Sequence, residues 1–221
     1  MFENIIKNVH NRHPLIHCIT NYVSINDCAN IVLACGGAPI MAEDINEVSQ
    51  ITSICQGLDI NIGMLNDNKL SSMLKAGATA NELGIPVILD PVGAGSSDYR
   101  IKAVQNLMSN VQFGVIRGNV SEIKAIAAKQ GIHNIAAGVY ETMQKNKSAM
   151  GVEAGIADKI TDDNIKEMAD FINKLSQKTG AVIAVTGGID MVADENRVYA
   201  IRNGHKMMSL VTGAGCQLSA L

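Results

Sequence analysis

The 221-residue sequence contains no tryptophan, only three phenylalanines and only four tyrosines. A hydrophobic core must therefore be aliphatic, with the eleven methionines filling irregular gaps. Charge is also sparse, because 18% of the residues are charged and the formal net charge is −3. This balance argues against a phosphate-binding surface for nucleic acid and against an anionic-membrane surface. We expect neither nucleic acid nor a membrane as a partner.

Long apolar runs are missing as well. The first fifteen residues, MFENIIKNVHNRHPL, contain no stretch of signal-peptide length, and AVIAV at 181–185 is far too short to cross a bilayer. We therefore expect a cytoplasmic protein. The five cysteines are odd in number and form no C-x-x-C pair, which argues against a disulfide framework and against zinc. We expect four of them to be buried packing residues.

Two nucleotide-binding signatures are absent. No G-x-x-x-x-G-K-[ST] occurs, which excludes the ordinary P-loop. The early glycines give no G-x-G-x-x-G after the first predicted strand, which weighs against a dinucleotide-binding Rossmann domain.

Short apolar runs alternate with segments of helical period along the chain. The predicted strands are 14–20, 38–40, 59–63, 86–90, 111–116 and 181–185. The helix after the first strand has Ser24 as its expected N-cap. The helix after the second carries Ile45, Val48, Ile51 and Cys55 on one face. This alternation favours a largely parallel sheet covered by helices on both faces, so we expect an α/β fold.

The later part of the chain predicts two further features. The segments MVA and RVYAI, joined by residues 194–196, are typical of a β-hairpin and add an antiparallel edge. Residues 132–157 are the least periodic, and we interpret them as an exposed, mobile excursion. No linker or repeat interrupts the pattern, so we expect one domain over 1–221.

Residues with charged or hydroxyl side chains, which can bind ligands, follow the predicted strands. Asp90 ends PVILD, Arg117 follows VQFGVI with Glu122 five residues on, and Thr186 follows AVIAV. Ligands of open parallel sheets bind beyond the carboxyl ends of the strands. The carboxylates of Asp90 and Glu122 suit Mg²⁺, while Arg117 and Thr186 suit phosphate oxygens.

The segment VTGAGC at 211–216 adds glycines and a thiol where a helix is expected to open at Cys216. Gly213 and Gly215 allow a tight turn, and the first backbone N–H groups of such a helix favour negative charge. Preorganised donors of this kind stabilise a transferring phosphoryl group. The combination predicts phosphoryl transfer from a nucleotide.

Each of these features also has a plainer interpretation. Asp90 can simply end a strand, and Asn119 with Glu122 can form a helix cap and first-turn carboxylate. Arg117 can be a solvated charge, the glycines after Thr186 a simple turn, and Cys216 another buried small side chain. The functional interpretation depends on their occurrence together at successive strand ends.

Seven segments resemble the hydroxyethylthiazole kinase family of ribokinase-like enzymes, nearly from end to end. They are HCITNYVSINDCAN (17–30), GGAPIMAE (36–43), NIGML (61–65), ILDPVGAG (88–95), IRGNVSEI (116–123), VTGG (185–188) and VTGAGC (211–216). The resemblance implies a three-layer αβα ribokinase-like fold with a mostly parallel central sheet. It also implies a homotrimer with active sites between subunits, and ATP-dependent phosphorylation of 4-methyl-5-(2-hydroxyethyl)thiazole in thiamine biosynthesis or salvage.

The same resemblance implies roles for individual residues. Met41 and Gly213 match thiazole-binding positions, with Asn21 as a further candidate. Arg117 and Thr186 match ATP-binding positions, and Asp90 and Glu122 match acidic positions associated with Mg²⁺. Cys216 stands where most ribokinase-like enzymes have a catalytic aspartate, so it is the candidate catalytic residue.

This sequence also departs from the family pattern. Family members usually continue for several helices after GAGC, whereas this chain ends five residues after Cys216. We expect either a fragment or a protein that has lost activity, and residues 133–150 look longer than the usual loop. Two alternatives to the thiazole kinase stay open here: a catalytically inactive thiazole-binding or assembly protein, and another ribokinase-like enzyme such as a hydroxymethylpyrimidine kinase.

Overall fold

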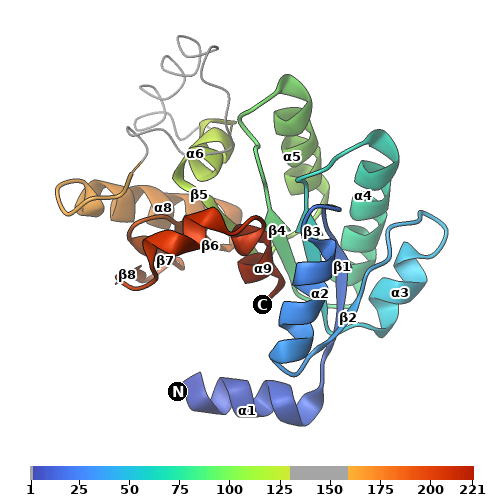
Figure 1. The fold of residues 1–221 in the computed structure, drawn as a ribbon. Coiled ribbons are helices and arrows are strands. Elements are labelled where there is room, and N and C mark those ends of the chain that lie inside the picture. The colour runs from blue at the N-terminus through green and yellow to red at the C-terminus, as the bar shows by residue number, and fades with distance from the viewer. Residues whose placement is uncertain (1, 130–158) are drawn as a thin grey trace. The chain divides into compact units, whose positions relative to one another are not determined.

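The computed structural model describes residues 2–129 and 159–221 (Figure 1). The chain divides into two compact units. Unit 1 comprises residues up to 90 together with 109–112 and 205–221, and unit 2 comprises 91–108 and 113–204. The expected excursion at 132–157, including 133–150, lies outside the described residues.

Unit 1 is built on parallel strands in the order β2-β1-β3-β4. Their bounds are β1 (Leu15–Ile19), β2 (Ala38–Ile40), β3 (Gly57–Asn61) and β4 (Val87–Asp90). The helical segments of this unit are α1 (Phe2–Arg12), α2 (Ile25–Ala34), α3 (Val48–Ile54), α4 (Asp67–Glu82), the short 3-10 helix η2 (Lys206–Leu210) and α9 (Ala214–Ala220). Each parallel connection passes through a helix, as the predicted alternation requires.

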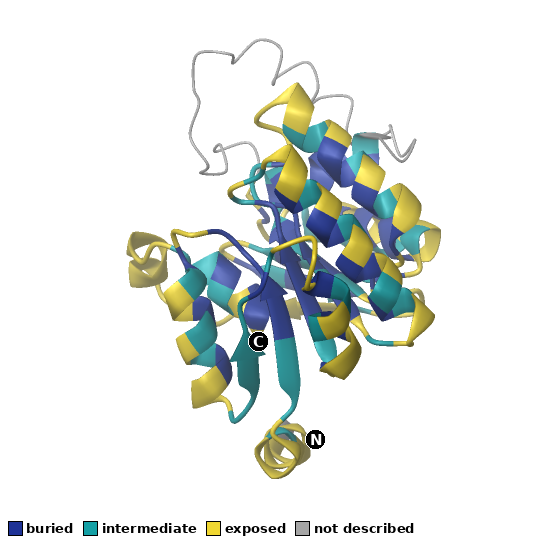
Figure 2. Ribbon diagram, turned by 90° about the vertical axis from the view of Figure 1, so that its right-hand side faces the viewer, coloured by how far each residue is buried: buried dark blue, intermediate teal, exposed yellow. Residues whose placement is uncertain are grey.

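The helices of unit 1 cover both faces of its strands. Helices α3 and α4 pack together on one face, and α2 and α9 pack together on the other (Figure 1). Buried residues concentrate on the strands and on the inward sides of these helices (Figure 2). The core between them is aliphatic, as the composition predicts, with Ile19, Leu58, Ile60 and Leu89 almost completely buried. Full burial of each such side chain contributes about 1.5–3 kcal/mol.

Unit 2 places its strands in the order β5-β6-β7-β8. Strands β5 (Val115–Asn119) and β6 (Val182–Thr186) are parallel, and β7 (Asp190–Ala193) and β8 (Val198–Ile201) continue antiparallel. The hairpin expected around residues 194–196 is therefore confirmed. The helices of this part of the chain are α5 (Asp98–Asn110), α6 (Val120–Lys129) and α8 (Ile165–Thr179). The α/β class is confirmed in both units.

Two predictions of where an element begins are wrong. The strand expected at 111–116 begins at Val115, because Val111 and Phe113 are buried by packing outside any strand. Helix α3 begins at Val48, after a turn in which Asp44 Oδ1 accepts from the backbone N–H and the side chain of Asn46. The turn leaves Ile45 exposed outside the helix.

Ser24 occupies the expected N-cap position of α2, but its side chain makes no capping hydrogen bond. Its hydroxyl donates instead to Asn21 Oδ1 at 3.1 Å. The side chain of Ser24 therefore holds the segment between β1 and α2.

Among the cysteines, four are buried as expected, but the exposed one is Cys35 and the buried set includes Cys216.

Candidate active site

Unit 1 contains a buried chain of polar side chains centred on Asn61, the last residue of β3. Its Nδ2 donates to Asp90 Oδ2 at 2.9 Å, on the neighbouring strand β4. Its Oδ1 accepts from Asn21 Nδ2 at 3.1 Å and from the backbone N–H of Gly63 at 2.9 Å. Because donors and acceptors surround it in this order, the Asn61 amide can adopt only one orientation. Asp90 is thus fixed at the end of its strand.

The Asn21 amide connects this hydrogen-bonded chain to Cys216. Its Nδ2 also donates to Cys216 Sγ at 3.2 Å, across a sequence separation of 195 residues. Its Oδ1 accepts from the backbone N–H groups of Val23 and Ser24 and from the Ser24 hydroxyl. Every polar atom of the Asn21 side chain therefore has a partner within the protein. The geometry makes Asn21 the residue that orients the Cys216 sulfur.

Cys216 lies in α9, which begins at Ala214, two residues before the predicted start. Cys216 is buried, with 9% of the residue exposed. One turn later, Ser219 donates its hydroxyl hydrogen to Asp90 Oδ2 at 2.8 Å. The same carboxylate oxygen thus receives hydrogen bonds from β3 and from α9, which ties the helix of Cys216 to the strand ends.

Gly213 precedes α9 in the left-handed backbone region, with φ +77°. A Cβ at this position would lie 2.7 Å from Ser24 Cβ, closer than van der Waals contact allows. Only glycine fits, and it brings the start of α9 against the residues that follow β1. Gly213, Asn21, Asp90 and Cys216 therefore lie close together within unit 1.

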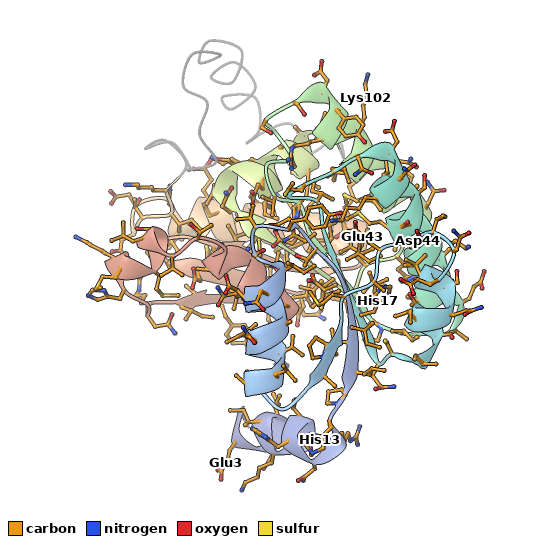
Figure 3. All side chains as sticks on the ribbon, turned by 45° about the vertical axis from the view of Figure 1, so that its right-hand side comes forward. Glu3, His13, His17, Glu43, Asp44 and Lys102 are labelled. Carbon is orange, nitrogen blue, oxygen red and sulfur yellow. The ribbon has the colours of Figure 1, made fainter. Side chains whose placement is uncertain are left out.

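Met41 is half-buried and directly follows β2. The carbonyl of the next residue, Ala42, accepts from His17 Nε2 at 2.8 Å, and His17 Nδ1 lies 2.9 Å from Thr52 Oγ1. Figure 3 labels His17, which lies on β1, and Glu43, which lies in the segment after β2. Burial lowers the pKa of His17, although the Ala42 carbonyl and Glu47 act in the opposite direction. His17 thus favours its neutral form, with the proton on Nε2.

Cys18 and Cys28, two other cysteines of unit 1, have a different role from that of Cys216. Burial raises the pKa of Cys28 to about 11, and burial followed by the charge of Asp59 raises that of Cys18 well above the usual range. Both thiols remain protonated near neutral pH and act as packing residues, as predicted for them.

Unit 2 contains the Arg117 and Thr186 pair. The two residues lie on the neighbouring parallel strands β5 and β6, in a register that pairs Asn119 with Thr186. Arg117 Nη2 donates to Thr186 Oγ1 at 2.7 Å, and both residues are half-buried. Arg117 is the third residue of β5 rather than a residue that follows the strand. The two candidate phosphate-binding side chains therefore contact each other, an arrangement that the sequence did not predict.

Glu122 is buried at the start of α6 in unit 2. Its Oε2 accepts from the backbone N–H of Asn119, and Asn119 Oδ1 accepts from the backbone N–H of Glu122, at 2.8 and 2.9 Å. This reciprocal pair is a capping box, so the plainer interpretation of Glu122 is correct. The other oxygen, Oε1, accepts from the N–H of Gly93 at 2.8 Å and holds the loop that follows Asp90. A role in metal binding stays a prediction beside this structural one.

Residues 2–129 and 159–221 contain no cluster of three or more His, Cys, Asp or Glu side chains arranged to hold a metal ion. Within the same residues, no helix is both long and apolar enough to span a membrane.

Sequence reasoning missed four residues that shape the site: His17, Asn61, Lys69 and Ser219. Asn61 is the last residue of β3, but the predicted strand at 59–63 placed it inside the strand, so the strand-end criterion that selected Asp90 did not select it. His17 and Lys69 gave no signal, because a histidine inside a strand and a lysine in a helical first turn are both ordinary in sequence. Ser219 required knowledge that α9 continues past Cys216.

The sequence model of the hydroxyethylthiazole kinase family matches residues 6–161 and 132–221 of this chain. A hydroxyethylthiazole kinase of Clostridium acetobutylicum is 52% identical over 221 residues, which are 100% of this chain and 75% of that protein. One of Desulfovibrio desulfuricans is 44% identical over 100% of this chain and 72% of its own length.

Solved structures agree with these sequence matches. The hydroxyethylthiazole kinase structure of Pyrococcus horikoshii OT3 has a TM-score of 0.81 and 32% identity, covering 99% of this chain and 73% of that one. A phosphomethylpyrimidine kinase of Clostridium difficile 630 has a TM-score of 0.56 and 12% identity, covering 94% of this chain and 100% of that one. The second similarity concerns the ribokinase-like fold alone.

Proposed function

The chain belongs to the hydroxyethylthiazole kinase family, and from that membership we propose that it transfers the terminal phosphoryl group of ATP to the hydroxyl of 4-methyl-5-(2-hydroxyethyl)thiazole, in thiamine biosynthesis or salvage. The observation that carries the proposal is the 52% sequence identity to a hydroxyethylthiazole kinase, in an alignment that covers 100% of this chain. No observation favours the inactive binding protein or the hydroxymethylpyrimidine kinase over it.

On the substrate side, we assign thiazole binding to Met41 and Gly213, with Asn21 beside them. Gly213 supports this role because its backbone approaches Ser24 where a side chain would not fit. Asn21 supports it through Cys216, whose sulfur its amide orients. An alcohol placed against Cys216 would have a hydrogen-bonding partner as its proton leaves. In a loose phosphoryl-transfer transition state that proton leaves late, so the contribution of Cys216 is modest.

On the nucleotide side, we assign phosphate binding to Arg117 and Thr186. A planar guanidinium neutralises phosphate oxygens, and the hydroxyl that it already contacts presents a second donor. Because both side chains are half-buried, they remain open to a ligand while the strands hold them in place.

Asp90 and Glu122 remain our candidates for Mg²⁺ ligands. Carboxylate oxygens are the donors that Mg²⁺ prefers, and hydrogen bonds fix the orientation of each carboxylate here. When bound, Mg²⁺ neutralises the charge on the transferring phosphate. The protein's own contribution is to hold these carboxylates in fixed orientation.

The test of the proposal is ATP consumption by the purified chain, with and without the thiazole alcohol and with and without Mg²⁺. We expect consumption only when both are present. Consumption that is indifferent to the thiazole alcohol, or that occurs with hydroxymethylpyrimidine alone, would reject this substrate.

We further propose that the protein is a cytoplasmic homotrimer, since the family resemblance implies active sites shared between subunits. Light scattering on the purified protein tests this assembly. A strict monomer that phosphorylates the thiazole alcohol at a normal rate would contradict it.

A further inference from the structure

Lys69, near the start of α4, has one of the most buried cationic side chains in the described residues. Its side chain is 2% exposed. Removal of an ammonium group from water is strongly unfavourable unless partners in the protein replace the lost hydration. Apolar residues of similar size usually serve as well or better for stability alone. The contacts of Lys69 therefore indicate what this buried charge does.

Three groups surround the Lys69 ammonium. Glu43 Oε2 lies 2.8 Å away, the carbonyl oxygen of Thr20 accepts a short hydrogen bond, and the Tyr22 ring centroid lies 4.4 Å away. The Tyr22 hydroxyl donates to the other oxygen of Glu43 and closes the cluster. We call these four residues, Thr20, Tyr22, Glu43 and Lys69, the clamp.

The Glu43 carboxylate stays charged within the clamp. Burial acts to raise its pKa, but the hydrogen bonds from Lys69 and Tyr22 outweigh burial and hold the pKa below its usual value. The Glu43 side chain is 36% exposed, so it connects the buried ammonium to the surface of unit 1 (Figure 3). The ion pair is therefore intact at neutral pH.

The clamp joins the two segments that carry the candidate thiazole-binding side chains. Thr20 and Tyr22 stand on either side of Asn21 in the sequence, and Glu43 stands two residues after Met41. Lys69 holds both segments from α4, whereas His17 holds the second segment from β1 through the Ala42 carbonyl. One ammonium group thus sets how far the Asn21 segment lies from the Met41 segment.

We propose that Lys69 is a positioning residue for the thiazole alcohol: by fixing these two segments relative to each other it sets the affinity for this substrate, without touching it. The proposal rests on the proposed function, because that function assigns Asn21 and Met41 to the substrate. The partners of the Lys69 ammonium group are the clamp residues Thr20, Tyr22 and Glu43, so the rate of phosphoryl transfer in the fully bound enzyme should change little.

The primary experiment compares Lys69→Met with Lys75→Met. Lys75 is a matched control, because it also lies on α4 and its Nζ donates to a backbone carbonyl of the segment after β2, that of Ile45, at 2.8 Å. For Lys69→Met we expect KM for the thiazole alcohol to rise about tenfold, with kcat and KM for ATP within about twofold of wild type. For Lys75→Met we expect all three constants within about twofold of wild type.

Two further variants separate the ion pair from simple loss of bulk. Lys69→Arg keeps the charge and the donors, and we expect it to recover most of the lost affinity, to within about threefold of wild type. Glu43→Gln keeps an acceptor for Tyr22 but removes the charge, and we expect it to raise KM for the thiazole alcohol in the same direction as Lys69→Met. An unchanged KM in Lys69→Met overturns the proposal, as does an equal rise in Lys75→Met.

Hydrogen–deuterium exchange of the ligand-free proteins tests the clamp without any activity. We expect Lys69→Met to raise exchange at residues 20–24 and 41–45 selectively. A uniform rise over unit 1 would assign Lys69 to stability and overturn the positioning role. Failure of the wild-type chain to phosphorylate the thiazole alcohol would refute the proposed function, whereas an absent exchange response in Lys69→Met would refute the clamp.

Discussion

The two units hold their candidate functional side chains in different ways. In unit 1, the amides of Asn21 and Asn61 connect Asp90 to Cys216, and all four residues are buried. In unit 2, Arg117 and Thr186 form one contact between half-buried side chains. A buried network of hydrogen bonds is rigid and costly to interrupt. We therefore expect changes in unit 1 to affect stability first, and changes to the Arg117–Thr186 pair to affect activity first.

The largest expected effect is that of Asn61→Leu on stability. Leucine removes one hydrogen-bonding partner each from Asn21 Nδ2, from the Gly63 N–H and from Asp90 Oδ2. We expect the free energy of unfolding to fall by about 3 kcal/mol, since each buried polar group that loses its partner costs about 1–3 kcal/mol. Urea unfolding measures this change. Asn46→Leu, at an exposed turn residue, is the control and should stay within about 0.5 kcal/mol.

Arg117→Ala is expected to produce the largest loss of activity. The variant removes the guanidinium proposed to neutralise phosphate, so kcat/KM for ATP should fall about 100-fold, with little change in the melting temperature. Steady-state kinetics and a thermal melt measure the two quantities. Arg202→Ala removes an exposed arginine that pairs with Asp162 and should leave the kinetics unchanged. Loss of folding in Arg117→Ala would contradict this prediction, because the variant would then affect stability as strongly as activity.

The pH dependence of stability provides a smaller test. The pKa of His17 in the folded protein lies below its ordinary value of 6.5, so the unfolded chain binds more protons than the folded chain below that pH. Stability from this group is complete above about pH 6.5 and is lost as the pH falls toward the lowered pKa, with a slope of at most about 1.4 kcal/mol per pH unit. Urea unfolding between about pH 5 and 7.5 measures it.

His17→Gln is expected to flatten this dependence, whereas His10→Gln, at an exposed histidine, should leave it intact. The same acid dependence in His17→Gln as in wild type would show that another group carries it. In that case the polar interior of unit 1 would be less sensitive to pH than its burial indicates.

The smallest expected effect is that of Cys216→Ser on turnover. Serine retains a hydrogen-bonding group beside Asn21 and removes only the thiol, so kcat should fall by about threefold to fivefold. The loss should be smaller than that for Arg117→Ala. The opposite order in steady-state kinetics would contradict a modest role for the thiol and give the substrate side the larger share of catalysis.

Strand periodicity predicted the α/β class, the late hairpin and most strand positions, because alternating apolar runs need burial wherever they occur. Asp90 and Thr186, which the strand-end criterion selected, are the last residues of their strands, and their roles stay predictions. The same criterion overlooked Asn61, since the predicted strand at 59–63 placed it inside the strand whereas β3 ends at this residue. Ser24 looked like a helix cap, but a tertiary hydrogen bond to Asn21 replaced the local one. Three expectations stay predictions: that residues 1–221 form one domain, that Asp90 and Glu122 bind Mg²⁺, and that the protein forms a trimer.

By itself, the sequence determined the aliphatic core, the order of strands and helices, and the kinase family, because these depend on local periodicity and on short motifs. Only the tertiary structure decided that Asn21 meets Cys216, that Asn61 orders Asp90, and that Lys69 joins the segments of Asn21 and Met41. Those contacts connect residues far apart in the chain. Their energy depends on distance, orientation and burial, and spacing along a sequence specifies none of the three.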